Sequence, residues 1–164
     1  LNLEFKCIDI NNNLRKNLSI LNLSSFKLPS NIEIGSAINN TNELFEGIHF
    51  LLLPSLWHES GSRLIYEAYS RGIPVIAFSS GGTKEFMKYN PEDLFPLPVT
   101  YLDVHKILRI KKWDPHLMLS RFQELINDQM YYDNYSKEIL SIFRNLDLDK
   151  KCTDKLNKLI LNLT

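Results

Sequence analysis

Residues 48–78 read IHFLLLPSLWHESGSRLIYEAYSRGIPVIAF, and this stretch decides the fold. It holds two continuous apolar segments, 48–53 and 74–78, with a helical segment, 63–71, between them. Strands that are apolar at every position are buried on both faces, which is typical of a parallel sheet covered by helices. A right-handed crossover connects the strands of such a strand–helix–strand unit. The stretch therefore predicts an α/β fold with a parallel sheet flanked by helices.

The sequence on either side continues the alternation of strands and helices as far as about residue 100. Beyond that point the strand signals stop, and helical signals remain. Outside the stretch we expect strands at 3–8 and 31–34, and helices at 14–23, 41–46, 83–88, 116–127, 131–145 and 150–161. The expected helix N-caps include Thr41 and Ser60. We predict one domain over residues 1–164, with the sheet in about 1–100 and C-terminal helices in about 103–162.

The composition excludes little but points to an ordinary globular domain. Lys plus Arg and Asp plus Glu number 19 each, so the net charge is zero and gives no electrostatic argument for nucleic acid or an anionic membrane. Cys7 and Cys152 have no CxxC partner or companion histidines, which argues against a zinc site or a disulfide framework. No apolar run approaches the roughly 20 residues that span a bilayer. We expect a cytoplasmic protein, at most peripheral to the inner membrane face.

The segment before the helix places small polar residues between two carboxylates, Glu59 and Glu67. In an open α/β sheet, ligands bind beyond the carboxyl ends of the strands, where the unpaired amides of the next helix attract anions. Gly61 and Ser62 have no bulky side chain, so a phosphate can approach the backbone closely. A carboxylate can accept two hydrogen bonds from a vicinal diol such as a ribose or a sugar ring. The pattern predicts a site for a nucleoside-diphosphate sugar.

The same residues also have a purely structural interpretation, which the sequence leaves open. Glu67 and Arg71 have the i,i+4 spacing of an ordinary surface ion pair. Ser60 can be only an N-cap, and Glu59 can be only a carboxylate placed near a helix N-terminus.

Two further features favour packing over ligand binding. The turn Ser79–Gly82 is explained by a tight connection from strand to helix, although it could touch a sugar or a phosphate. Tyr131, Tyr132 and Tyr135 are better explained by helix packing than by a platform for a sugar.

Several short motifs in this region occur in the order found in one enzyme family. The chain resembles the donor-binding half of family 4 retaining glycosyltransferases of the GT-B fold, whose motif is two glutamates separated by seven residues. The matching residues are Pro54-Ser55, Glu59, Glu67-Ala68, Gly72-Ile73-Pro74-Val75 and Gly81-Gly82. The resemblance is strong over about residues 32–90 and extends loosely through the C-terminal helices. It implies a Rossmann-like, parallel-sheet domain.

The resemblance also implies a role for each site residue. Glu59, the catalytic candidate, would hold hydroxyls of the transferred sugar, and Glu67 would bind the ribose hydroxyls. The diphosphate would lie on the backbone amides of Gly61, Ser62, Arg63 and Leu64. The nucleobase would lie against Gly35, Ser36, Ala37 and Ile38. A nucleotide sugar is then a substrate, and no cofactor or metal is expected, because helix amides and basic side chains stabilise the leaving diphosphate.

The chain departs from the family pattern in two ways. The family's Phe-Gly within the motif is Gly61-Ser62 here. The basic residues that neutralise the diphosphate, and the whole acceptor-binding half, would precede Leu1. We therefore expect a larger enzyme of which this chain is the donor-binding part, and no sugar transfer by the chain alone. The acceptor is left open, with a polysaccharide or a glycolipid precursor as candidates.

Two other functions remain open at this stage. A nucleotide-sugar 2-epimerase shares the GT-B architecture, although its typical motifs are not apparent in this sequence. A non-catalytic nucleotide-binding or interaction domain would account for a chain that lacks the basic residues that neutralise the diphosphate. The sequence names neither the sugar nor the base.

Overall fold

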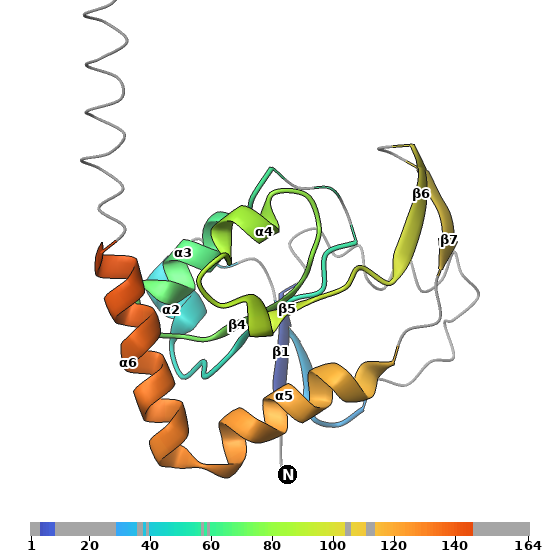
Figure 1. Ribbon diagram of the computed structural model, residues 1–164. Coiled ribbons are helices and arrows are strands. Elements are labelled where there is room, and N and C mark those ends of the chain that lie inside the picture. Colours follow the sequence, from blue (N-terminus) through green and yellow to red (C-terminus); the bar gives the residue numbers. More distant parts are fainter. Residues whose placement is uncertain are drawn as a thin grey trace, which may run out of the picture. The chain divides into compact units, whose positions relative to one another are not determined.

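The computed structural model describes residues 4–8, 29–35, 38, 40–56, 58, 60–103, 106–110 and 114–145 (Figure 1). The chain divides into two compact units, Leu1–Gly47 and Ile48–Thr164, and each is described by itself. The helices expected at 14–23 and 150–161 lie outside the described residues. That the two units form a single domain stays a prediction.

The first unit contains a parallel pair of strands. Strand β1 (Phe5–Ile8) pairs with β2 (Ile32–Gly35), with Phe5 opposite Ile32 and Ile8 opposite Gly35. The expected strands at 3–8 and 31–34 are therefore confirmed, and they run parallel.

A short helix follows in the same unit, and its N-cap differs from the prediction. Helix α2 (Thr41–Phe45) begins at Thr41, but Asn40 is the cap. The Asn40 side-chain oxygen accepts a hydrogen bond from the backbone N–H of Asn42 at 3.0 Å. Asn40 has extended backbone angles and a short acceptor side chain, which an N-cap requires. The prediction of Thr41 as the cap was therefore wrong by one residue.

The second unit contains the strand–helix–strand stretch. Strand β3 (Leu51–Leu53) runs parallel to β4 (Val75–Phe78), with Leu51 opposite Val75, and helix α3 (Arg63–Tyr69) connects them. Every residue of β4 is buried, as its continuous apolar sequence predicts. A third strand, β5 (Leu94–Phe95), pairs parallel to the other side of β4, which gives the order β3-β4-β5. The predicted parallel sheet is confirmed for this unit.

One element of the second unit contradicts the prediction that strands stop near residue 100. Strands β6 (Val99–Asp103) and β7 (Lys106–Ile110) form an antiparallel hairpin with an irregular register. Its strands begin with β-branched Val99 and include Ile107 and Ile110, residue types that favour strands. The connection lacks the Asn-Gly or Asp-Gly pair that marks most tight hairpin turns, so the sequence signal was weak.

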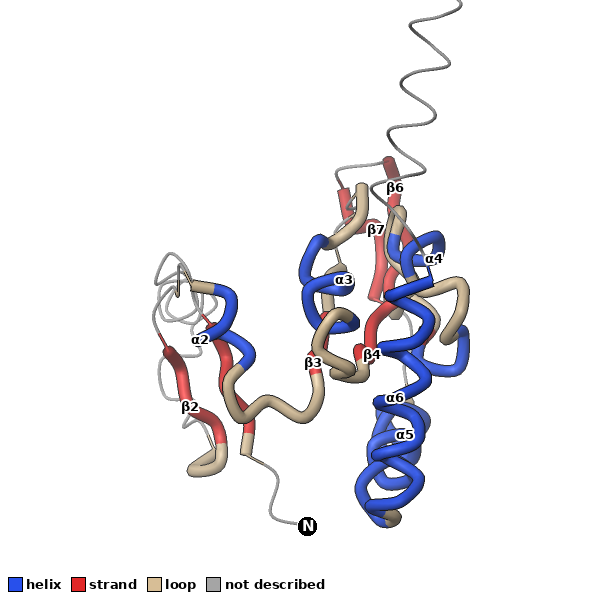
Figure 2. Tube along the Cα trace, turned by 90° about the vertical axis from the view of Figure 1, so that its left-hand side faces the viewer, coloured by secondary structure: helices blue, strands red, loops and turns tan. Residues whose placement is uncertain are grey.

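Helices cover the β3-β4-β5 sheet (Figure 2). They are α3, α4 (Thr83–Phe86), the 3-10 helix η1 (Pro91–Asp93), α5 (Pro115–Asn127) and α6 (Gln129–Asn145). The core of this unit consists of side chains that are at most 1% exposed, among them Ile65, Ala68, Tyr69, Val75, Ile76, Ala77, Met87, Leu125 and Ile139. The helices predicted at 116–127 and 131–145 are confirmed as α5 and α6.

Helix α6 is fastened to the rest of its unit by polar contacts as well as by apolar packing. The Tyr132 hydroxyl donates to the His49 carbonyl at 2.9 Å, just before β3. The Ser136 hydroxyl donates to the Gly72 carbonyl at 2.6 Å, just after α3. Gly72 has φ +69°, and a side chain there would meet the Ser136 Oγ at 2.7 Å. A glycine therefore lets α3 end directly against α6.

Across the described part of the chain, no helix is both long enough and apolar enough to cross a membrane.

Candidate functional site

The junction between β3 and α3 holds most of the predicted site residues. Helix α3 begins at Arg63, and Ser62 is the residue at its N-cap position, without a side-chain capping bond. The predicted cap, Ser60, lies two residues too early. Gly61 explains the difference, because its φ of +144° is a conformation that side-chain-bearing residues rarely adopt. The chain therefore turns at Gly61 before the helix can start.

The two glycine-containing loops of this region pack directly against each other. A Cβ on Gly61 would lie 2.2 Å from the ring of Phe86, and a Cβ on Gly82 would lie 2.1 Å from the carbonyl oxygen of Ser60. The loop after β3 and the turn after β4 are therefore in contact, and both glycines are required for it. One side of Gly61 is occupied by Phe86, so a phosphate bound to this loop has to approach from another side.

Glu67 lies on the second turn of α3 with its side chain 21% exposed. Its carboxylate accepts a hydrogen bond from the Arg63 guanidinium at 3.0 Å. Arg71 donates instead to the backbone carbonyl of Glu67, at 2.8 Å. The structural interpretation paired the Glu67 side chain with Arg71, whereas the structure shows an ion pair with Arg63, one turn earlier.

The other predicted residues are only partly described. Glu59, the catalytic candidate, lies outside the described residues, and so do Ser36 and Ala37. Ser62 and Leu64 are half-buried at the start of α3. Gly35 ends β2 in the first unit, and Ile38 is half-buried in the same unit. The proposed base-binding and sugar-binding residues thus belong to different units, and their joint role stays a prediction.

A buried polar cluster of the second unit was missed by the sequence analysis. Asp93 is fully buried at the end of η1, and its Oδ1 lies 2.6 Å from the Nε of Arg121 on α5. The hydroxyl of Tyr135 on α6 donates to the other oxygen of Asp93, and Asn90 donates to the Tyr135 oxygen at 3.0 Å. Three helical elements therefore meet at one buried carboxylate.

The electrostatics of this cluster favour a charged pair. Burial raises the pKa of the Asp93 carboxyl, against the hydrogen bonds from Tyr135 and Arg121 that favour its ionised form. Burial alone would lower the pKa of Arg121, but hydrogen bonds to Asp93 and Tyr131 raise it above its ordinary value. The 2.6 Å contact is that of an ion pair, so we assign charges to both groups. Neither group reaches the surface, which makes this cluster structural.

The sequence did contain a signal for this cluster. Arg121 occupies a position on the apolar face of α5, together with Met118, Phe122 and Leu125, all of which are buried. A charged residue within an apolar stripe requires a buried partner of opposite charge. Of the three tyrosines expected to pack, Tyr135 is buried and Tyr131 is 41% exposed.

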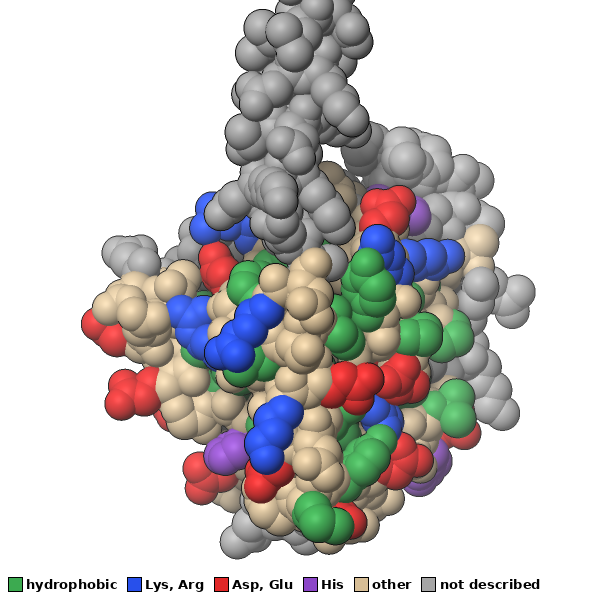
Figure 3. All heavy atoms as spheres, turned by 60° about the vertical axis from the view of Figure 1, so that its left-hand side comes forward, with side chains coloured by type: hydrophobic (Ala, Val, Ile, Leu, Met, Phe, Trp, Pro, Cys, Tyr) green, Lys and Arg blue, Asp and Glu red, His purple; other side chains and the backbone are tan. Residues whose placement is uncertain are grey.

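The surface seen in Figure 3 carries side chains of both charge signs among apolar ones. This mixture agrees with the zero net charge of the chain. Within the described residues, no group of three or more His, Cys, Asp or Glu side chains is placed to hold a metal ion. The sequence matches no model of a known protein family, and a search of curated proteins finds no match.

Proposed function

We propose that this chain binds a nucleotide-sugar donor, as the donor-binding part of a retaining glycosyltransferase with a Rossmann-like fold. The proposal combines the motif order from Pro54 to Gly82 with the arrangement of the second unit. There a parallel strand leads through a loop into a helix that carries Glu67. Ligands of open α/β sheets bind at the carboxyl ends of the strands, which is where this loop begins.

The observation that carries the proposal is the state of the Glu67 carboxylate. It is only 21% exposed, yet its partner Arg63 has a side chain that is 88% exposed. Such an exposed ion pair contributes at most about 1 kcal/mol, so a ligand can separate it at little cost. A partly buried carboxylate beside an exposed arginine is suited to accept hydrogen bonds from the two hydroxyls of a ribose.

Arg63 has a second role in this proposal. When a nucleoside diphosphate binds, the Arg63 guanidinium leaves Glu67 and turns to the phosphate oxygens, for which its fork of donors is well suited. This exchange supplies positive charge next to the diphosphate. Glu59, by the family resemblance, holds hydroxyls of the transferred sugar.

A second candidate function is a nucleotide-binding module without catalysis. The ion pair of Arg63 with Glu67 favours it equally, because the pair serves nucleotide binding whether or not transfer follows. The two candidates differ only in the role of Glu59. A loss of nucleotide-sugar affinity in Glu59→Gln would favour the transferase, and no loss would favour the non-catalytic module.

The test is titration calorimetry of the full chain with UDP, GDP and ADP and with the corresponding nucleotide sugars. Glu67→Gln should weaken binding of the preferred nucleoside diphosphate about tenfold or more, since hydrogen bonds to charged groups are worth about 1.5–3 kcal/mol. Glu138→Gln, an exposed change on α6, is the matched control and should leave the affinity unchanged. Thermal melts of each variant check that the fold is intact.

Glu59→Gln completes the test. It should leave the affinity for the bare diphosphate unchanged and weaken only the binding of the nucleotide sugar. Failure of every nucleotide to bind would refute the donor-binding proposal. Equal affinity of the wild type and of Glu59→Gln for the nucleotide sugar would show that Glu59 does not bind the sugar. The chain would then be a non-catalytic nucleotide-binding module.

A further inference from the structure

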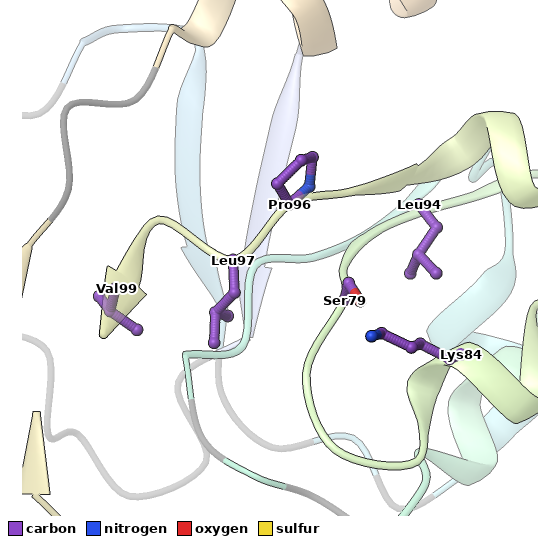
Figure 4. Close-up of a pocket in the computed structure, with 6 residues that line it drawn as sticks. All are labelled: Ser79, Lys84, Leu94, Pro96, Leu97 and Val99. Carbon is purple, nitrogen blue, oxygen red and sulfur yellow. The ribbon is translucent and has the colours of Figure 1, made fainter. Parts of the chain in front are cut away.

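A hollow in the second unit lies at the carboxyl ends of β4 and β5 (Figure 4). Its volume is about 420 Å³, within the range of small-molecule sites. It is lined by Ser79, Lys84, Leu94, Pro96, Leu97 and Val99. None of these six residues belongs to the set predicted to bind the nucleotide sugar.

The hollow exists because two paired strands part after a short ladder. Phe78 lies opposite Phe95, and the Ser79 N–H donates to the Phe95 carbonyl at 2.7 Å. Pro96, which has no N–H, then ends the pairing, and the chain runs on toward β6. The segment that follows β4 turns away at Ser79 and leads into α4. The hollow lies beyond the carboxyl ends of β4 and β5, the edge of an open α/β sheet at which ligands bind.

The chemistry of the lining is divided between two walls. Lys84 carries the only charge among the six lining residues, and its ammonium group points into the same space as the Ser79 side chain (Figure 4). Leu97 and Val99 form the apolar wall away from Lys84, whereas Leu94 lies on the same side as Ser79 and Lys84 (Figure 4). Leu94 and Leu97 are half-buried, and Val99 is 4% exposed. Among the described residues, no carboxylate forms an ion pair with Lys84.

We propose that this hollow binds a small amphiphilic anion, with its anionic head at Lys84 and Ser79 and its short apolar body against Leu94, Leu97 and Val99. An uncompensated ammonium beside a hydroxyl selects a phosphate or a carboxylate. The apolar wall gains free energy by covering hydrocarbon. The lining shares no residue with the proposed donor-binding set, and the two proposals are tested with different ligands, so either can fail without the other.

The experiment uses amide chemical shifts of the ¹⁵N-labelled full chain during three titrations. The probes are hexyl phosphate, which has head and body, inorganic phosphate, which has the head alone, and hexanol, which has the body alone. Hexyl phosphate should shift the amides of Ser79, Lys84 and Leu97 in a saturable way. It should bind about tenfold or more tighter than inorganic phosphate, because each buried methylene contributes roughly a factor of four.

Two lysine variants test the anionic end. Lys84→Gln should weaken hexyl phosphate about three- to fivefold, as expected for an exposed ion pair, and leave hexanol unchanged. Lys88→Gln is the control, because Lys88 lies over the Tyr89 ring, 4.8 Å from its centroid, and does not line the hollow. Leu97→Ser should weaken hexyl phosphate and leave inorganic phosphate unchanged.

Each contrary result overturns the assignment. Shifts that saturate elsewhere would place the ligand outside the hollow. Equal affinities for hexyl phosphate and hexanol would exclude the anionic head, and equal affinities for hexyl phosphate and inorganic phosphate would exclude the apolar body. Equal losses from Lys84→Gln and Lys88→Gln would remove the role of Lys84.

Discussion

Two arginine–carboxylate pairs in the second unit have the same chemistry and opposite surroundings. In the pair on α3, the Arg63 side chain is 88% exposed and Glu67 is 21% exposed, and they share one hydrogen bond of 3.0 Å. In the pair between α5 and η1, Arg121 is 9% exposed and Asp93 is 1% exposed, at 2.6 Å. Tyr135 and Asn90 extend the second pair through their side chains, whereas around the first pair Ser70 and Arg71 donate to the Glu67 backbone carbonyl.

The difference shows how one interaction type serves two purposes. The buried pair cannot separate without leaving a desolvated charge, so it fixes the relative positions of η1, α5 and α6. The exposed pair contributes little to stability, so it can separate at small cost, as the proposed donor binding requires. Burial, rather than the identity of the partners, decides which pair stabilises the fold and which can separate at little cost.

The largest expected effect comes from breaking the buried pair. Arg121→Met keeps the length of the side chain and removes its charge, which leaves Asp93 buried without a cation. We expect a loss of about 3–5 kcal/mol in the free energy of unfolding. Urea denaturation followed by circular dichroism measures it.

A double variant tests the reason for that loss. Asp93→Asn combined with Arg121→Met removes both charges, so it should be more stable than Arg121→Met alone. If the double variant lost as much as the sum of the two single variants, the pair would not be coupled, and the buried charge would not be the cause.

An intermediate effect is expected from Tyr69, next to the buried pair. The Tyr69 hydroxyl is buried and finds no hydrogen-bond partner among the described residues. Burial, and then the charge of Asp93, raises the pKa of Tyr69 well above its ordinary value. The folded chain therefore keeps this proton above pH 10, where the unfolded chain loses it, so stability should fall as the pH rises beyond 10.

Tyr69→Phe should remove the part of the alkaline decrease in the free energy of unfolding that comes from Tyr69. By pH 11 the contribution of one such tyrosine is about 1.4 kcal/mol. At pH 7 the variant should be as stable as the wild type or slightly more stable, since an unpaired buried hydroxyl is removed. Urea midpoints at pH 7 and pH 11 give both values. An unchanged pH dependence in Tyr69→Phe would show that Tyr69 is not protonated differently in the two states.

The smallest effect is expected from the matched change at the exposed pair. Arg63→Met should alter the free energy of unfolding by less than about 0.5 kcal/mol, because exposed ion pairs contribute little. The same urea experiment that serves Arg121→Met measures it. Similar losses from the two arginine variants would remove the distinction between the pairs.

The local part of this structure could be predicted from the sequence. Val75 to Phe78 is apolar at every position, and it forms a buried parallel strand as expected. Helix α5 was expected from residue 116 and begins at Pro115, one residue earlier, because proline is well tolerated at the first helical position. Such features depend on periodicity and on residues within one or two turns, which a sequence displays directly.

The remainder depends on contacts between distant residues. The Arg121–Asp93 pair joins positions 28 residues apart, and the Tyr135–Asp93 bond joins positions 42 apart. A single sequence gives no partner for each charge, although Arg121 on an apolar face shows that one is needed. The helix start at Arg63 agrees with the expected segment, but the N-cap was misplaced at Ser60, because the sequence alone does not show the positive φ of Gly61, next to which the Phe86 ring packs. The hollow at Lys84 arises from two diverging strands and has no local motif.

The contacts of α6 have a consequence for the order in which the chain is made. This helix closes bonds back to His49 and Gly72, across 83 and 64 residues. During synthesis the segment that contains β3, α3 and β4 emerges first. Its apolar residues stay exposed until α6, which covers them, has been translated. The second unit can therefore complete its fold only after Tyr132 and Ser136 have left the ribosome. A pause in translation before α6 would prolong the time for which this nascent chain is open to aggregation and to chaperones.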